Sequence, residues 1–163
     1  MLIQTYGVSF PYSVFDERCR VIMTERTSAG VPVKSGAREL IGDLRARGIP
    51  TAIATSSRQP HAQHQLGAVG LLDMFDTIVT RNDVTFPKPH PEPYLTAAKR
   101  LGIEPRHCLA LEDSHAGVHA AHAAGMQTVM VPDLVHPNDE ILGLGITVMD
   151  SLIHVHRAAF EPA

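Results

Sequence analysis

Short apolar runs alternate with longer helix-like stretches along most of the chain. The runs are continuous rather than broken by polar positions, as in strands of a parallel sheet that helices cover on both faces. They predict strands at 50–55, 77–80, 108–111, 128–131 and, more weakly, 146–149. The stretches around them predict helices at 36–47, 59–69, 91–101, 114–124 and 151–159. This alternation predicts an α/β fold, a Rossmann-like parallel sheet with helices on both faces.

The N-terminal part of the chain follows a different pattern. Apolar positions such as Val14 and Ile22 are mixed with charged ones such as Asp16 at helical spacing, and no strand-like run precedes them. We therefore expect a helical segment at 1–33 that lies outside the sheet, followed by the α/β domain at 34–163.

Composition narrows the classes of function. The chain has 163 residues and a net charge of −3, with 44% hydrophobic and 19% charged residues, which is typical of a soluble globular domain. The slight acidity and the low aromatic content argue against nucleic acid as a partner. No apolar stretch reaches the roughly 18 residues of a membrane span, and the two cysteines form no Cys-x-x-Cys pair. We expect a cytoplasmic protein with no nucleic-acid or membrane partner.

Ligands of parallel α/β sheets bind outside the carboxyl ends of the strands. The residues directly after each predicted strand are therefore the candidates for a functional site. Thr55, Ser56 and Ser57 follow the first predicted strand and place three hydroxyls where a helix is expected to begin. Free backbone N–H groups at a helix start favour phosphate binding. The alternative is that a hydroxyl caps the helix and no ligand is involved.

Lys88 lies in a proline-rich loop with the sequence Phe-Pro-Lys-Pro-His-Pro-Glu. Prolines leave such a loop few conformations to lose on ordering, which makes the lysine a candidate fixed cation for a phosphoryl oxygen. The alternative is an ordinary lysine in a solvated turn.

Two acids, Glu112 and Asp113, end an apolar run and precede a predicted helix. Adjacent side chains of a strand point to opposite sides, so at least one carboxylate can face the ligand crevice and hold a hard cation such as Mg²⁺. The other can accept hydrogen bonds from the following loop. The alternative is that these acids only cap the following helix and interact with its dipole.

His115, His119 and His122 share one face of the predicted helix that follows. Paired histidines on a helix bind zinc where further ligands complete the site. Alanines surround these three histidines and the pattern includes no acidic partner. A solvated polar face is therefore favoured over a metal site.

Taken together, these segments resemble the haloacid dehalogenase-like superfamily of phosphohydrolases. The resemblance is to the branch of β-phosphoglucomutase and of small sugar-phosphate or pseudouridine-phosphate phosphatases. Residues 30–57 resemble the approach to its second motif, and 87–103 its third motif, with Lys88 as the family lysine. Residues 108–126 are similar to its fourth motif. The resemblance runs from about residue 12 to the C-terminus.

The resemblance implies a reaction and a role for each candidate residue. Thr55 and Ser56 would bind the phosphoryl group, and Lys88 would neutralise it together with the attacking carboxylate. Asp113, with Glu112, would hold Mg²⁺. The substrate would be a small phosphorylated metabolite, whose phosphoryl group passes to an aspartate and then to water or to a second hydroxyl.

The sequence departs from the family at its first motif. That motif, Asp-x-Asp-Gly-Thr after a first strand, supplies the nucleophile and the general acid/base, and this chain contains no Asp-x-Asp. Neither Asp16 in its charged segment nor Asp73 and Asp76 ahead of the second predicted strand is a credible replacement. We expect Met1 to fall inside the family's helical cap, so that 1–33 is a partial cap.

In the family the missing strand is central, between the strands that correspond to 50–55 and 108–111. Without it we expect a slot about two strand spacings wide, roughly 10 Å, with two rows of unpaired backbone groups. Each buried unpaired group costs about 1–3 kcal/mol. Either the halves close up, another segment fills the slot, a partner chain supplies a strand through exchange or a dimer, or the fold is unstable.

Three hypotheses about function follow. The first is a phosphatase whose complete chain is longer than this sequence, the 163 residues being inactive alone. The second is a catalytically dead remnant or a strand-accepting interaction module. The third is a shortened protein that binds phosphate and Mg²⁺ without turnover. Substrate specificity in this branch comes largely from the cap, half of which this sequence lacks.

Overall fold

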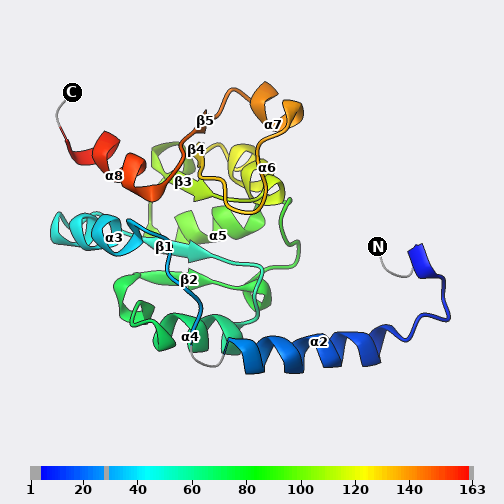
Figure 1. Ribbon diagram of the computed structural model, residues 1–163. Helices are drawn as coiled ribbons and strands as arrows, with labels where there is room; N and C mark the ends of the chain where they lie inside the picture. Colours follow the sequence, from blue (N-terminus) through cyan, green and yellow to red (C-terminus); the bar gives the residue numbers. More distant parts are fainter. Residues whose placement is uncertain (1–4, 28–29, 162–163) are drawn as a thin grey trace.

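The computed structural model describes residues 5–27 and 30–161. Its strands form two sheets (Figure 1), each with parallel strands. One sheet pairs β1 (Ala52–Ala54) with β2 (Thr77–Val79). The other has the order β3 (Leu109–Glu112), β4 (Gln127–Met130) and β5 (Thr147–Val148).

Helices connect the strands in the order that the sequence pattern predicts. The α-helices are α2 (Tyr12–Arg26), α3 (Ala37–Ala46), α4 (Gln59–Ala68), α5 (Glu92–Leu101), α6 (His115–Ala123), α7 (Asp139–Gly143) and α8 (Leu152–Phe160). Three single turns of 3₁₀ helix lie between them: η1 (Leu72–Met74), η2 (Arg81–Asp83) and η3 (Pro105–His107).

The parallel α/β prediction is confirmed, and every predicted strand and helix of the sheet domain is present within two residues of its expected ends. Helix α7 was not predicted, because its five residues are too few to show a helical period. It begins at a local signal instead, since the Asn138 side chain accepts a hydrogen bond from the N–H of Ile141 (3.0 Å).

Side chains of the larger sheet alternate between two buried faces. On one face, Val129 packs with Leu40 of α3 and Val155 of α8. On the other face, Met130 packs with Val118 of α6. Coverage of both faces explains the apolar residues Val129 and Met130, and the buried hydroxyl of Thr128 is satisfied by donating to the carbonyl of Met126 (3.2 Å).

Helix α5 lies against both sheets. Its Ala97 belongs to a cluster against which Ala52 of β1 packs. Its Ala98 lies in a second cluster with Ala110 of β3, and Ala54 of β1 packs against this same cluster. Apolar packing on α5 therefore joins the two halves of the molecule.

No hydrogen bond among the described residues pairs β1 with β3, so the sheet is divided at the place where the sequence predicts a missing central strand. Of the expected outcomes, two do not occur in the described part of the chain. The halves do not close into one sheet, and none of the described segments forms a strand between them.

Helix α2 projects to one side of the sheets (Figure 1) and has no buried residue. Its helical structure agrees with the expected segment outside the sheet. The division into 1–33 and 34–163 stays a prediction, and residues 1–4 and 28–29 lie outside the described part. Within the described residues, no helix is long and apolar enough to span a membrane.

Asp83 fastens the end of β2 to α5. One of its carboxylate oxygens accepts hydrogen bonds from the N–H and the hydroxyl of Thr80 (2.8 and 2.6 Å). The other oxygen accepts one from Arg100, which also donates to the carbonyl of Ile78 (2.9 Å). The Thr80 hydroxyl and then Arg100 lower the pKa of Asp83 from 3.8 to about 2.

We predict that Asp83→Asn lowers the free energy of unfolding at pH 7 by about 1 kcal/mol, a value that allows for solvent around Arg100. Because the folded state depresses this pKa, the stabilisation is complete above pH 4 and disappears as the pH falls towards 2. Urea unfolding at pH 7, 4 and 2.5 measures it. Asp73→Asn, which changes an exposed carboxylate, is the control, and an equal loss in both variants would contradict the prediction.

Candidate active site

A buried ion pair between Lys88 and Glu112 lies where the two sheets end. The lysine comes from the loop before α5, and the glutamate is the last residue of β3. Their side chains are only 10% and 7% exposed. The Lys88 ammonium also donates to the carbonyl of Ala54, the last residue of β1 (2.9 Å). The predicted lysine and acid thus meet at the carboxyl ends of β1 and β3.

Tyr94 of α5 completes this group. Its hydroxyl donates to the same oxygen of Glu112 that binds Lys88, and it accepts from the Lys88 ammonium (3.3 Å). The ammonium therefore has a partner for each of its three N–H groups. To bind a phosphoryl oxygen directly, Lys88 must give up one partner, and the long contact with Tyr94 is the weakest.

Sequence reasoning missed Tyr94, because a tyrosine on the apolar face of a helix normally indicates core packing. Burial, and next the charge of Glu112, raise the pKa of Tyr94 far above its usual value. Its hydroxyl stays protonated, so it is always able to donate to the carboxylate. The one available signal is its position, six residues after the predicted lysine.

Thr55 and Ser56 lie directly after β1, as predicted, but neither caps α4. That helix begins at Gln59, and the residue before it makes no side-chain cap. The Thr55 hydroxyl instead accepts a hydrogen bond from the N–H of Ser57 (3.1 Å). Ser56 is exposed. The capping alternative is therefore wrong, and the phosphate-binding role stays a prediction.

Glu112 and Asp113 point to different surroundings, as expected for neighbours at a strand end. The second oxygen of Glu112 accepts a hydrogen bond from the Ser114 hydroxyl (3.1 Å), so both of its oxygens are engaged. Asp113 is exposed. The helix cap is Ser114, whose hydroxyl accepts from the N–H of Gly117 (3.1 Å), so capping does not account for Asp113.

The donor set suits Mg²⁺ in its chemistry, because this ion takes carboxylate oxygens and keeps several waters and phosphate oxygens as further ligands. Asp113 is the exposed carboxylate, while Glu112 is held by Lys88 and Tyr94. No group of three or more His, Cys, Asp or Glu side chains gathers as a metal site in the part of the chain that the structure describes. The role of both acids in holding Mg²⁺ stays a prediction.

Gly117 is required by the position of Glu112. A Cβ at Gly117 would lie 1.9 Å from a carboxylate oxygen of Glu112. The hydrogen bonds to Lys88, Tyr94 and Ser114 keep that carboxylate from moving aside. The first turn of α6 therefore approaches the carboxylate as closely as a backbone can.

Glu92 shapes the loop that carries Lys88, a role that the sequence did not reveal. Its carboxylate accepts hydrogen bonds from the N–H groups of Thr85 (2.9 Å) and Phe86 (2.8 Å). These two bonds lower the pKa of Glu92. The start of α5 and the start of the loop are thereby tied together on either side of Lys88.

Two of the three histidines of α6 contact the α7 region. The Nε2 of His115 bonds to the carbonyl of His136 (2.8 Å), and that of His119 lies 3.2 Å from the carboxylate of Glu140. His122 is exposed. Two of the three therefore have protein partners.

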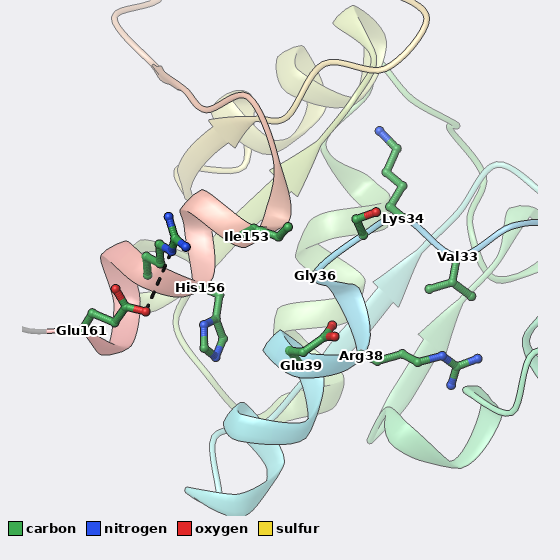
Figure 2. A pocket seen from close by; sticks show the side chains of 10 residues that line it. Val33, Lys34, Gly36, Arg38, Glu39, Ile153, His156 and Glu161 are labelled. Carbon is green, nitrogen blue, oxygen red and sulfur yellow. Dashed lines mark ion pairs between the residues drawn. The ribbon is translucent and has the colours of Figure 1, made fainter.

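A cavity of about 530 Å³ lies elsewhere, between the start of α3 and α8 (Figure 2). None of the predicted site residues lines it. Several of its polar side chains already have partners: Lys34 lies 3.5 Å from Asp133, His156 lies 2.7 Å from Asp43, and Arg38 donates to the carbonyl of Val69. We place the candidate active site at Lys88 and Glu112, because the predicted chemistry converges there.

Comparison with known proteins agrees with this geometry. The family described as haloacid dehalogenase-like hydrolase matches residues 2–131. The chain belongs to this family. The resemblance that the motifs carry is thereby confirmed, and the Rossmann-like architecture agrees with its structural neighbours.

Relatives within the family include phosphatases and a phosphomutase. Hexitol phosphatase B of Escherichia coli (strain K12) is 33% identical over 121 residues, 74% of this chain and 54% of that protein. The structure of β-phosphoglucomutase from Clostridium difficile superposes with a TM-score of 0.73 at 25% identity, covering 97% of this chain and 73% of that one. CbbY from Rhodobacter sphaeroides in complex with phosphate gives 0.69 at 30% identity, covering 75% and 55%. The chain spans about half the length of the curated relatives it matches.

We predict that Gly117→Ala destabilises the protein, because the new methyl group must displace the Glu112 carboxylate from its hydrogen bonds, each worth about 1–3 kcal/mol. Gly42→Ala is the matched control, since a Cβ there meets nothing within 4 Å. Both changes gain about 1 kcal/mol of helix propensity. In thermal unfolding, the control should keep or raise the Tm while Gly117→Ala lowers it. Equal Tm values would show that the carboxylate moves freely.

Proposed function

We propose that the complete protein is a Mg²⁺-dependent phosphohydrolase that acts on a small phosphorylated metabolite. The family supports hydrolase chemistry, and the names of several relatives indicate phosphorylated substrates. The observation that carries the proposal is the convergence of Lys88 with Glu112 at the carboxyl ends of β1 and β3, beside Thr55.

Each residue has a role that its position permits. The hydroxyls of Thr55 and Ser56, with their backbone N–H groups, would hold the phosphoryl oxygens. Lys88 would neutralise charge that develops on the phosphoryl group. Asp113, with Glu112, would hold Mg²⁺, which supplies further positive charge when bound. Glu112 and Tyr94 hold the Lys88 ammonium in place.

The reaction would be carboxylate nucleophilic catalysis. An aspartate oxygen bonds to phosphorus while the bond to the leaving oxygen breaks, and water then cleaves the acyl phosphate to release phosphate. The nucleophile would come from an Asp-x-Asp sequence, which this chain does not contain. This observation favours a second candidate as well, in which the chain binds phosphate and Mg²⁺, or a partner, without turnover.

We predict no Mg²⁺-dependent hydrolysis of p-nitrophenyl phosphate by the 163-residue chain, because no aspartate stands where the nucleophile belongs. Release of p-nitrophenol at 405 nm in a matched series with and without protein measures this. Turnover well above background that Lys88→Ala abolishes would reveal a nucleophile outside the expected motif.

Phosphate binding tests the site without requiring turnover. We predict that Ser56→Ala weakens the affinity for inorganic phosphate about fivefold in the presence of Mg²⁺, since it removes one hydrogen-bond donor worth about 1 kcal/mol. Calorimetric titration measures the Kd. Ser56 is exposed, so the fold should be unaffected. Ser9→Ala, also exposed and far along the chain, is the control, and equal Kd values in the two variants would contradict the assignment.

A further inference from the structure

We propose that Asn82 is a positioning residue for the phosphate-binding turn, which is the name we give to residues 55–58 between β1 and α4. Asn82 holds this turn from the end of the neighbouring strand β2 and does not itself touch the phosphoryl group. The inference rests on the proposed function, because it concerns how the same site is kept ready for phosphate.

The phosphate-binding turn has few restraints of its own. One hydrogen bond lies within it, from the N–H of Ser57 to the hydroxyl of Thr55 (3.1 Å). The hydroxyl and the N–H of Ser56 have no hydrogen-bond partner among residues 5–27 and 30–161. The direction in which these two donors point is therefore set by the backbone on either side of Ser56.

Two hydrogen bonds from η2 supply the restraint that the turn lacks. The N–H of Arg81 donates to the carbonyl of Ser57 (2.9 Å). The side-chain oxygen of Asn82 accepts a hydrogen bond from the N–H of Gln59, the first residue of α4 (3.0 Å). The turn is thereby held near its centre and at its end, although Asn82 lies 23 residues beyond Gln59 in the sequence.

Pairing of β1 with β2 brings η2 to this position. Ala54 lies opposite Val79 in the register of the two parallel strands, so the segments that follow these strands lie side by side (Figure 1). The backbone of η2 is itself anchored. The Thr80 hydroxyl accepts a hydrogen bond from the N–H of Asn82 (3.3 Å), and the N–H of Thr80 donates to Asp83 (2.8 Å). Asn82 therefore reaches α4 from a fixed support.

Asn82 takes the place of the N-cap side chain that α4 lacks. Such a side chain normally belongs to the residue before the helix and accepts from an N–H of the first turn. Arg58 stands there, and a guanidinium cannot accept. Pro60 has no N–H, so the N–H of Gln59 is the first that needs an acceptor. Asparagine supplies this acceptor without a negative charge, which would repel a phosphate bound nearby.

A turn that is already fixed binds an anion more tightly than a mobile one, because its donors need no ordering on binding. Asn82→Ala leaves the hydrogen bond between Arg81 and Ser57 in place, so it loosens the turn without releasing it. We expect this variant to weaken the affinity for inorganic phosphate about threefold in the presence of Mg²⁺. Calorimetric titration of the 163-residue chain measures the Kd.

A matched control separates positioning from simple stabilisation of α4. Gln63 lies at an exposed position of the same helix, and its replacement by glycine destabilises the helix through its backbone. Asn82→Ala and Gln63→Gly should lower the Tm by similar amounts, since a lost cap and a helical glycine have similar effects on a helix. Only Asn82→Ala should raise the Kd for phosphate.

NMR reports on the turn in the absence of phosphate. In Asn82→Ala, the amide signals of Ser56 and Ser57 should shift, and the Gln59 amide should exchange with solvent about fivefold faster. Asn82→Asp keeps an oxygen acceptor at the same place and should restore the slow exchange of Gln59. The rescue is measured by exchange and not by the Kd, because the added charge itself repels phosphate.

Three results would overturn the inference. Equal Kd values in the wild type and Asn82→Ala, with a lowered Tm, would make Asn82 a cap that only stabilises α4. A raised Kd with unchanged amide signals of the turn would mean that Asn82 contacts phosphate directly. An equal rise of the Kd in Gln63→Gly would attribute the effect to helix stability.

Failure of the proposed function gives a different result. In that case the wild type would bind no phosphate with or without Mg²⁺, and the role of Asn82 would fall with the site. The exchange rates of the Gln59 amide would still report whether Asn82 holds the turn, so the two failures are distinguishable.

Discussion

A buried ion pair at the end of a divided sheet determines how the candidate site is built. Lys88 and Glu112 are almost excluded from water, and removing one partner of such a pair costs about 3–5 kcal/mol. The surrounding atoms serve this pair: Tyr94 and Ser114 complete the hydrogen bonds of the carboxylate, and Gly117 leaves room for it. The ammonium reaches a backbone carbonyl of β1, so the pair also links the two halves of the molecule.

The two sheets are otherwise held together by apolar packing rather than by strand pairing. Ala97 and Ala98 of α5 lie against strands of both halves. Packing of small side chains is less directional than a hydrogen-bonded ladder, so it allows the halves to stay together while their facing edges stay open. A site assembled from the ends of several strands requires those ends to keep a fixed relative position. In this protein, packing against α5 fixes much of that position.

Local signals in the sequence were sufficient to predict the fold, but they predicted only part of the candidate site. Apolar runs and glycines after helices marked the strands and the long helices, because burial on two faces leaves a clear pattern. Lys88 and Glu112 were each identified from their surroundings. Their direct contact was not, since they lie 24 residues apart and only the folded chain brings them together. Tyr94 was missed because a tyrosine on the apolar face of a helix normally indicates core packing. Glu92 was missed because an acid in a first helical turn has an ordinary helix role.

The contact between α3 and α8 has a consequence for synthesis of the protein on the ribosome. Gly36 comes so close to α8 that a Cβ would lie 2.7 Å from the backbone N of Ile153, and Leu40 packs with Val155. The first helix of the α/β domain is thus covered by its last. During translation the apolar face of α3 stays without this cover until the residues of α8 leave the exit tunnel. The packing of α3 is therefore completed only once α8 is available, rather than segment by segment along the chain.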